Sequence, residues 1–154
     1  MEANTPTKST KWCLDMETAS VFTSFNLHVK DVERSKTFFT GLGFQLNPDF
    51  PDNGDSAAVL IGENLQVMLI RQDFFKTLTD REIVDTDKYA QMTIALTFKS
   101  REKVNEIVNT ALALGGKLHA DPEDYGDMYH WGFVDPDGHL WAVNCFGSGT
   151  EAGQ

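Results

Sequence analysis

The chain has 154 residues, 41% hydrophobic and 11% aromatic, which suffices for a single domain with a buried core. Its 13 basic and 23 acidic residues give a formal net charge of -10, which argues against a nucleic-acid partner because phosphate binding requires clustered Lys and Arg. No apolar run approaches the roughly 20 residues of a membrane span. Cys13 and Cys145 have no CxxC spacing. We therefore predict a cytoplasmic protein with free thiols and no membrane partner.

The two ends of the chain differ in composition from its middle. Residues 1–20 are polar and lack periodicity, which predicts a flexible N-terminal tail, and residues 147–154 ("GSGTEAGQ") predict a disordered C-terminal tail. The folded domain is expected over residues 21–146.

The first half of this domain begins with a strand over 21–29. Its side chains alternate, with Phe25 and Leu27 on one face and Asn26 and His28 on the other, so one face meets a core and the other a more polar surface. Asp31 is expected to cap a helix, "VERSKTFFTGLGF", whose glycines supply the C-terminal stop. The stretches "SAAVLIG" and "LQVMLI" then predict two strands joined by a tight turn.

The same order of elements occurs twice. "LHVKD" (27–31) aligns with "LTFKS" (96–100) at an offset of 69 residues, and the second half continues with "KLHA", "YHWGFVD" and "LWAVNCF", with "DPDG" as a hairpin turn. We therefore predict an α+β fold with two βαβββ modules, at about 21–72 and 91–146. Residues 73–90 are expected to form a connecting helix and loop.

These motifs carry a family resemblance. The stretches "NLHVKDVERSKTFF", "GLGF" and "GFVDPDGHLWAV", together with the duplication, resemble the vicinal oxygen chelate superfamily, which includes glyoxalase I, extradiol dioxygenases, and fosfomycin and bleomycin resistance proteins. More narrowly, "FFKTLTDREI" and "DYGDMYHWGFVDPDGHLWAV" are similar to predicted lactoylglutathione lyases. The resemblance implies curled mixed sheets around a cleft. It also implies a homodimer, with ligand sites at or near the module or subunit interface.

The resemblance further indicates where metal-using members carry their ligands. Those positions correspond here to Ser24, Thr93, Ala142 and, with a register uncertainty of one residue, Met68. A divalent ion needs at least three good donors in a fixed array, and two hydroxyls, a thioether and a methyl group do not supply them. We therefore predict no metal and no other cofactor. A divalent metal held by residues outside these positions is the alternative.

The four histidines offer acid or base chemistry. His28 lies on the pocket-facing side of the first strand, near the expected cleft mouth, and His130 begins the strand before "DPDG"; these two are the candidate catalytic residues. For His119 and His139 we expect surface or hydrogen-bonded roles, and His139, at the exit of the turn, is expected to be exposed.

The remaining candidates define a small-molecule pocket. Small or uncharged polar side chains provide room and hydrogen bonds, and aromatic rings can stack on a flat ligand. The predicted ligand-binding residues are Ser24, Asn26, Met68, Thr93, Ala95, Tyr129, Trp131, Ala142 and Asn144. This pattern favours a metal-independent protein that binds a small organic ligand, aromatic or cationic. The alternative is a lyase, isomerase or dioxygenase-type enzyme that uses His28, His130 or a non-standard metal site.

Overall fold

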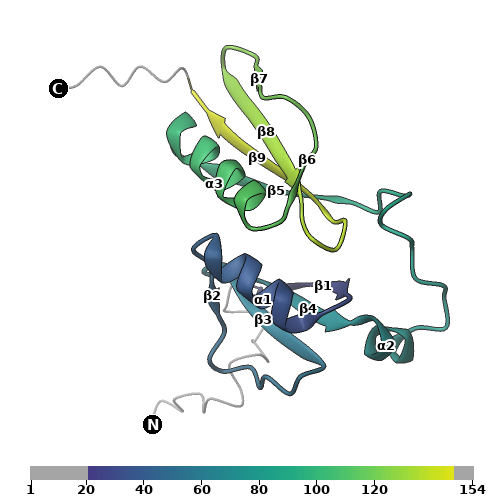
Figure 1. The fold of residues 1–154 in the computed structure, drawn as a ribbon. Coiled ribbons are helices and arrows are strands. Elements are labelled where there is room, and N and C mark those ends of the chain that lie inside the picture. Colours follow the sequence, from purple (N-terminus) through teal and green to yellow (C-terminus); the bar gives the residue numbers. More distant parts are fainter. Residues whose placement is uncertain (1–20, 148–154) are drawn as a thin grey trace, which may run out of the picture.

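The computed structural model describes residues 21–147, so the predicted N-terminal tail and all of the C-terminal tail except Gly147 lie outside the described residues (Figure 1). The first module contains β1 (Thr23–Val29), α1 (Val32–Gly41), β2 (Gln45–Leu46), β3 (Ser56–Gly62) and β4 (Leu65–Arg71). Its strands lie in the order β1-β4-β3-β2, with β1 parallel to β4 and the other pairs antiparallel.

The second module repeats this plan. It contains β5 (Thr93–Phe98), α3 (Arg101–Ala113), β6 (Lys117–Leu118), β8 (Met128–Val134) and β9 (Leu140–Phe146), in the sheet order β5-β9-β8-β6. A short strand that was not predicted, β7 (Glu123–Asp124), pairs with β8. The α+β fold of two βαβββ modules is confirmed, and β6 has only the first two residues of the predicted "KLHA" strand.

Both long helices begin at the residues that the sequence indicates. The carboxylate of Asp31 accepts a hydrogen bond from the backbone N–H of Arg34, and the hydroxyl of Ser100 accepts one from that of Lys103. Each cap satisfies a donor that the first helical turn leaves unpaired. The connecting segment holds only a short helix, α2 (Gln72–Phe75), and a 3-10 turn, η2 (Lys76–Leu78).

The two modules share one hydrophobic core. The inner faces of both sheets and one side of each long helix contribute to it. Rings from α1 reach the second sheet, with the Phe38 centroid 5.9 Å from that of Phe133 and the Phe39 centroid 5.2 Å from that of Trp141. Aromatic pairs at such separations contribute about 0.5–1.5 kcal/mol each beyond the area that they bury. The helix of one module therefore packs directly on the sheet of the other.

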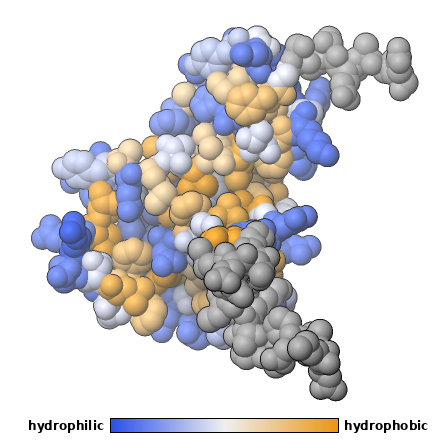
Figure 2. All heavy atoms as spheres, turned by 180° about the vertical axis from the view of Figure 1, so that it is seen from behind, coloured by the Kyte–Doolittle hydropathy of each residue, from blue (hydrophilic) through white to orange (hydrophobic). Residues whose placement is uncertain are grey.

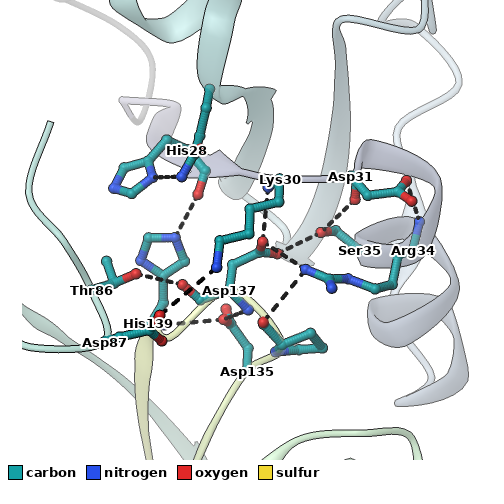
Figure 3. A network of polar contacts seen from close by, with 12 residues as sticks. His28, Lys30, Asp31, Arg34, Ser35, Thr86, Asp87, Asp135, Asp137 and His139 are labelled. Atoms are coloured by element: carbon teal, nitrogen blue, oxygen red, sulfur yellow. Dashed lines mark hydrogen bonds and ion pairs between the residues drawn. The ribbon is translucent and has the colours of Figure 1, made fainter.

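A buried carboxylate at the "DPDG" turn joins the modules by hydrogen bonds (Figure 3). Asp137 Oδ1 accepts from the backbone N–H of Lys30 at 2.8 Å and from the Arg34 guanidinium at 2.9 Å, and Oδ2 accepts from the Ser35 hydroxyl at 2.8 Å. All three donors belong to the start of α1 or to the residue just after β1. A charge buried in this way is tolerated because it is paired and hydrogen-bonded.

The neighbouring side chains of the turn are buried as well. Asp135 accepts from the backbone N–H groups of Asp137 and His139 and from the Trp141 indole N–H, at 2.9–3.0 Å. Burial raises the pKa of Asp135 despite these donors. The Nε2–H of His139 donates to the carbonyl of His28 at 2.8 Å. His139 thus has the expected hydrogen bond, but it is buried rather than exposed because the turn packs against the first module.

The same turn holds the connecting segment in place. The hydroxyl of Thr86 donates to the carbonyl of Asp137, and Gly138 has a φ of +88°. A Cβ on Gly138 would lie 2.8 Å from that hydroxyl oxygen, so the close approach and the backbone conformation both require glycine.

Replacing the carboxylate that joins the modules should destabilise the fold. In Asp137→Asn one oxygen becomes an NH2 group, which faces donors, so we expect a loss of about 1–3 kcal/mol in the free energy of unfolding. Urea denaturation of this variant and of Asp121→Asn, at an exposed position, measures the effect. Equal stability of the two variants would contradict this role for Asp137.

Candidate ligand-binding faces of the two sheets

Alternation along β1 divides its side chains between the core and the outer face of the first sheet. Leu27 belongs to the core, so Ser24 and Asn26 lie on the opposite face. The strand register pairs Ser24 with Gln66 and Asn26 with Met68, which brings Met68 to the same face. The three predicted ligand-binding residues of this module therefore lie together.

A hydrogen-bonded amide occupies the middle of this face. The Nε2 of Gln66 donates to Ser24 Oγ at 2.9 Å and lies 3.6 Å from Met68 Sδ, while its Oε1 accepts from Asn47 Nδ2 at 2.8 Å. Gln66 and Asn47 are buried. The side-chain polar atoms of Gln66 and Asn47 thus bond to one another and do not converge on one point in front of the sheet. Asn47 lies just after the two-residue strand β2. The sequence has no periodic pattern there, so it does not identify Asn47 as a residue of this face.

The outer face of the second sheet carries the other group of predicted residues. Ala95 pairs with Ala142, and Asn144 lies between Thr97 and His130. The Nδ1 of His130 is hydrogen-bonded to the side-chain oxygen of Asn144. Thr93 and Ala95 are exposed and Ala142 is half-buried, so small and neutral side chains make up this surface.

Beside Ala142 the neighbouring strand carries a glycine. Gly132 pairs with Ala142, and a Cβ on it would lie 2.5 Å from the carbonyl oxygen of Trp141. No larger residue fits there without moving the backbone. The position where metal-using relatives carry a carboxylate therefore lies between one glycine, Gly132, and one alanine, Ala95, on the neighbouring strands.

Two predicted ligand-binding residues lie on the opposite face of this sheet. Tyr129 and Trp131 alternate with His130 along β8 and pack against the shared core. The Tyr129 hydroxyl donates to Asn105 Oδ1 of α3 at 2.8 Å, and the Trp131 indole N–H donates to the carbonyl of Ala120 at 2.9 Å. The structure therefore does not bring these rings together with Ala142 and Asn144.

A single chain does not unite the two groups. The inner faces of both sheets contribute to one core, so the group around Ser24 and the group around Ala142 lie on separate sheets, each turned away from that core. The predicted site thus consists of two halves.

Neither half fits a divalent metal. No group of three or more His, Cys, Asp and Glu side chains is placed to hold an ion anywhere in residues 21–147. At the positions that correspond to the family ligands, Ser24 and Met68 contact the Gln66 amide, and Ala142 has no donor atom. The donor set is therefore inadequate in number and in chemistry.

His28 shares its face of β1 with Ser24 and Asn26, which are exposed, but it is itself buried, with 4% of its surface exposed. Its Nδ1 lies 3.4 Å from Gln72 Nε2, and its Nε2 has no hydrogen-bond partner. The ring centroid is 5.6 Å from that of Phe75 and 5.1 Å from that of His139, both edge-on. Burial, and next the nearby His139, lower the pKa of His28, while Asp137 acts in the opposite direction.

Comparison with known proteins identifies the class of fold. Residues 22–62 match the family model described as bleomycin resistance protein-like N-terminal. Among curated proteins, none matches the chain. Solved structures that match most of the chain confirm the fold that the resemblance implies, which is the glyoxalase/bleomycin resistance fold.

Three of these structures illustrate the match. A hypothetical protein SA1046 from S. aureus is 26% identical, with a TM-score of 0.71 over 84% of this chain and 96% of that one. A glyoxalase/bleomycin resistance protein/dioxygenase family enzyme from Burkholderia phytofirmans PsJN is 16% identical, with a TM-score of 0.70 and coverages of 82% and 99%. TnmS3, an antibiotic binding protein from Streptomyces sp. CB03234, is 21% identical, with a TM-score of 0.60 and coverages of 84% and 98%. The narrower similarity to lactoylglutathione lyases stays a prediction.

The lowered pKa of His28 should make stability depend on pH. Unfolded histidine titrates near pH 6.5, so just below this value the unfolded chain binds a proton that folded His28 does not. The free energy of unfolding should therefore fall as the pH decreases from about 7 to 5, by at most about 1.4 kcal/mol per pH unit for this one group. Urea denaturation at several pH values in this range gives the free energy of unfolding at each pH. This free energy should change less with pH in His28→Gln than in the control His119→Gln, which replaces an exposed histidine. Identical slopes for both variants would refute this assignment.

Proposed function

We propose that this protein binds a small organic molecule on the outer faces of its sheets without a metal, and that a second copy of the chain completes the site. The observation that carries the proposal is the chemistry at the positions of the family ligands. Ser24, Met68, Thr93 and Ala142 stand there, and the buried polar group nearest to the first two, Gln66, is already hydrogen-bonded within the protein.

The surface chemistry supports an organic ligand. The amides of Asn26 and Asn144 and the hydroxyl of Thr93 are at least partly exposed and uncharged, and Ala95 and Ala142 leave room beside them. Such a surface can form hydrogen bonds and exclude water without a fixed charge. The fold is shared with an antibiotic binding protein.

On the first sheet, aromatic contact with a ligand would come from other rings than Tyr129 and Trp131. Phe50 and Phe75, both half-buried, pack against Ala58, Met68 and Ile70 on the outer face of the first sheet. They border the same face as Ser24 and Asn26. A flat ligand on this face would have rings beside it even though Tyr129 and Trp131 lie elsewhere.

The edges of the sheets support a homodimer. Within residues 21–147, β1 and β5 each pair with one neighbouring strand only, and neither contains Lys, Arg, Asp, Glu or Pro. Long uncharged edges invite pairing with another chain. Leu78, Tyr89 and Met92 on the connecting segment are exposed, and Figure 2 shows apolar side chains across the middle of the molecule seen from behind. A second copy of the chain that covers these edges would bring the group around Ser24 of one chain next to the group around Ala142 of the other.

A charge at the β5 edge should separate the dimer. We expect sedimentation velocity to show a dimer for the wild type and for Ala113→Lys at the exposed end of α3, but a monomer for Ala95→Lys, because a buried lysine at an interface lacks a partner. A wild-type chain that is monomeric at every concentration would overturn the dimer proposal.

Filling the space beside Ala142 should abolish ligand binding. A compound from a panel of aromatic and cationic antibiotics that raises the Tm of the wild type should not raise that of Ala142→Trp, because the indole occupies the outer face of β9. Ala113→Trp places the same ring at an exposed helix end and should keep the full shift.

Measuring the metal content of the purified protein is the most direct test of the metal-independent function. Protein purified without chelators should contain no stoichiometric Zn, Ni or Fe. One equivalent of such a metal would overturn the metal-independent function if a chelator removed both the metal and the rise in Tm that the ligand causes.

The buried free thiol of Cys145 fits the cytoplasmic location that we propose.

A further inference from the structure

The loop that leads into β3 contains an asparagine followed by a glycine, Asn53 and Gly54, and both residues are exposed. In such a pair the backbone nitrogen of the glycine can attack the side-chain amide carbon of the asparagine, and glycine has no Cβ to obstruct the attack. The reaction releases ammonia and modifies the asparagine. Its rate depends on the groups that surround the amide and the attacking nitrogen.

The side-chain oxygen of Asn53 is held by two backbone donors. Its Oδ1 accepts from the N–H of Asp55 at 3.1 Å and from the N–H of Ser56 at 3.2 Å. Negative charge develops on this oxygen when a nucleophile adds to the amide carbon, and donors already directed at the oxygen stabilise that charge. The loop therefore holds the amide of Asn53 in an arrangement that favours attack on its carbon.

The attacking nitrogen has a proton acceptor beside it. The backbone N–H of Gly54 donates to Asp52 Oδ1 at 3.3 Å. The hydrogen bond from Lys36, and next the one from this N–H, lower the pKa of Asp52, so its side chain is a carboxylate at neutral pH. A carboxylate within reach of the proton that must leave can act as a general base.

The backbone at Gly54 leaves the attack open. Gly54 has a φ of +81°, and a Cβ built on it would have no heavy atom within 4 Å among the described residues beyond its chain neighbours. The positive φ requires glycine at this position, and no other part of the described chain covers the nitrogen there.

We propose that the fold promotes a spontaneous deamidation of Asn53, in which Asp52 accepts the proton and the N–H groups of Asp55 and Ser56 stabilise the oxyanion. The nitrogen of Gly54 bonds to Cγ of Asn53 while its proton passes to Asp52. The Cγ–Nδ2 bond then breaks, and the side-chain nitrogen takes that proton and leaves as ammonia. Water opens the resulting succinimide ring at either carbonyl, so the products are aspartate and isoaspartate.

The modification would change the start of β3. Either product adds a negative charge between Asp52 and Asp55, and isoaspartate also adds one atom to the backbone. Asp55 is fixed on the far side of the pair, because its carboxylate pairs with Arg71 at 2.8 Å and its carbonyl accepts from the N–H of Arg71 at 2.8 Å. The extra atom must therefore be accommodated in the loop before Asp55. None of the reacting residues belongs to the ligand-binding faces, so this inference does not rest on the proposed function.

Peptide mapping by mass spectrometry tests the site on the full chain incubated at neutral pH, and an isoaspartyl methyltransferase detects the isoaspartate. Deamidation should accumulate at Asn53 and not at Asn64, which is also exposed but is followed by Leu65. A synthetic peptide of residues 49–57 gives the rate without the fold. Asn53 should react about tenfold faster in the full chain, because the peptide does not hold the donors and the base in place.

Substitutions identify the groups that promote the reaction. Asp52→Ala should slow deamidation in the full chain about tenfold, because the proton acceptor is lost. Asp121→Ala is the matched control, since it removes an exposed carboxylate of the second module and should keep the wild-type rate. Asn53→Gln should give no product at this position, because its longer side chain cannot close a five-membered ring.

Two results would overturn the proposal. One is a rate in the full chain that equals or falls below the rate in the peptide, which would show that the fold does not promote the reaction. The other is an equal rate in Asp52→Ala and Asp121→Ala, which would remove Asp52 from it.

Discussion

The position of the two modules depends on the carboxylate of Asp137. It is buried where the "DPDG" turn meets the first module, and each of its oxygens is satisfied by donors from the start of α1 or the end of β1. A buried carboxylate is costly without such donors, so the turn has one favourable place on the first module. Once it is there, α1 packs on the second sheet, and the core forms between the modules.

This packing determines what a single chain can offer a ligand. Because the inner faces of both sheets are used in the shared core, the outer faces turn away from it, and Ser24 is separated from Ala142. Each half-site is built from small or internally paired polar groups. A ligand that uses both halves needs two chains, and neither half alone brings together the three or more donors that a divalent ion requires within residues 21–147.

Periodicity predicted the elements well and the site only in part. The caps at Asp31 and Ser100 and the faces of Ser24 and Asn26 follow from local spacing, which the fold leaves unchanged. Tyr129 and Trp131 were placed by their aromatic character, although residues adjacent to His130 on a strand cannot share its face. Asn47 lies in an irregular segment, and its position depends on its hydrogen bond to Gln66, which is 19 residues away in the sequence.

The burial of His28 follows from the same module junction. His139 reaches the carbonyl of His28 because Asp135 holds the backbone of the turn, and the two imidazole rings then meet edge-on at 5.1 Å. The connecting segment covers the other side of His28, fixed through Thr86 to the same turn. His28 and residues 81–84 of the connecting segment line a cavity of about 300 Å³, so this cavity and the junction share their supports. A molecule that binds only when this cavity is formed must stabilise the association of the modules by the free energy of its binding.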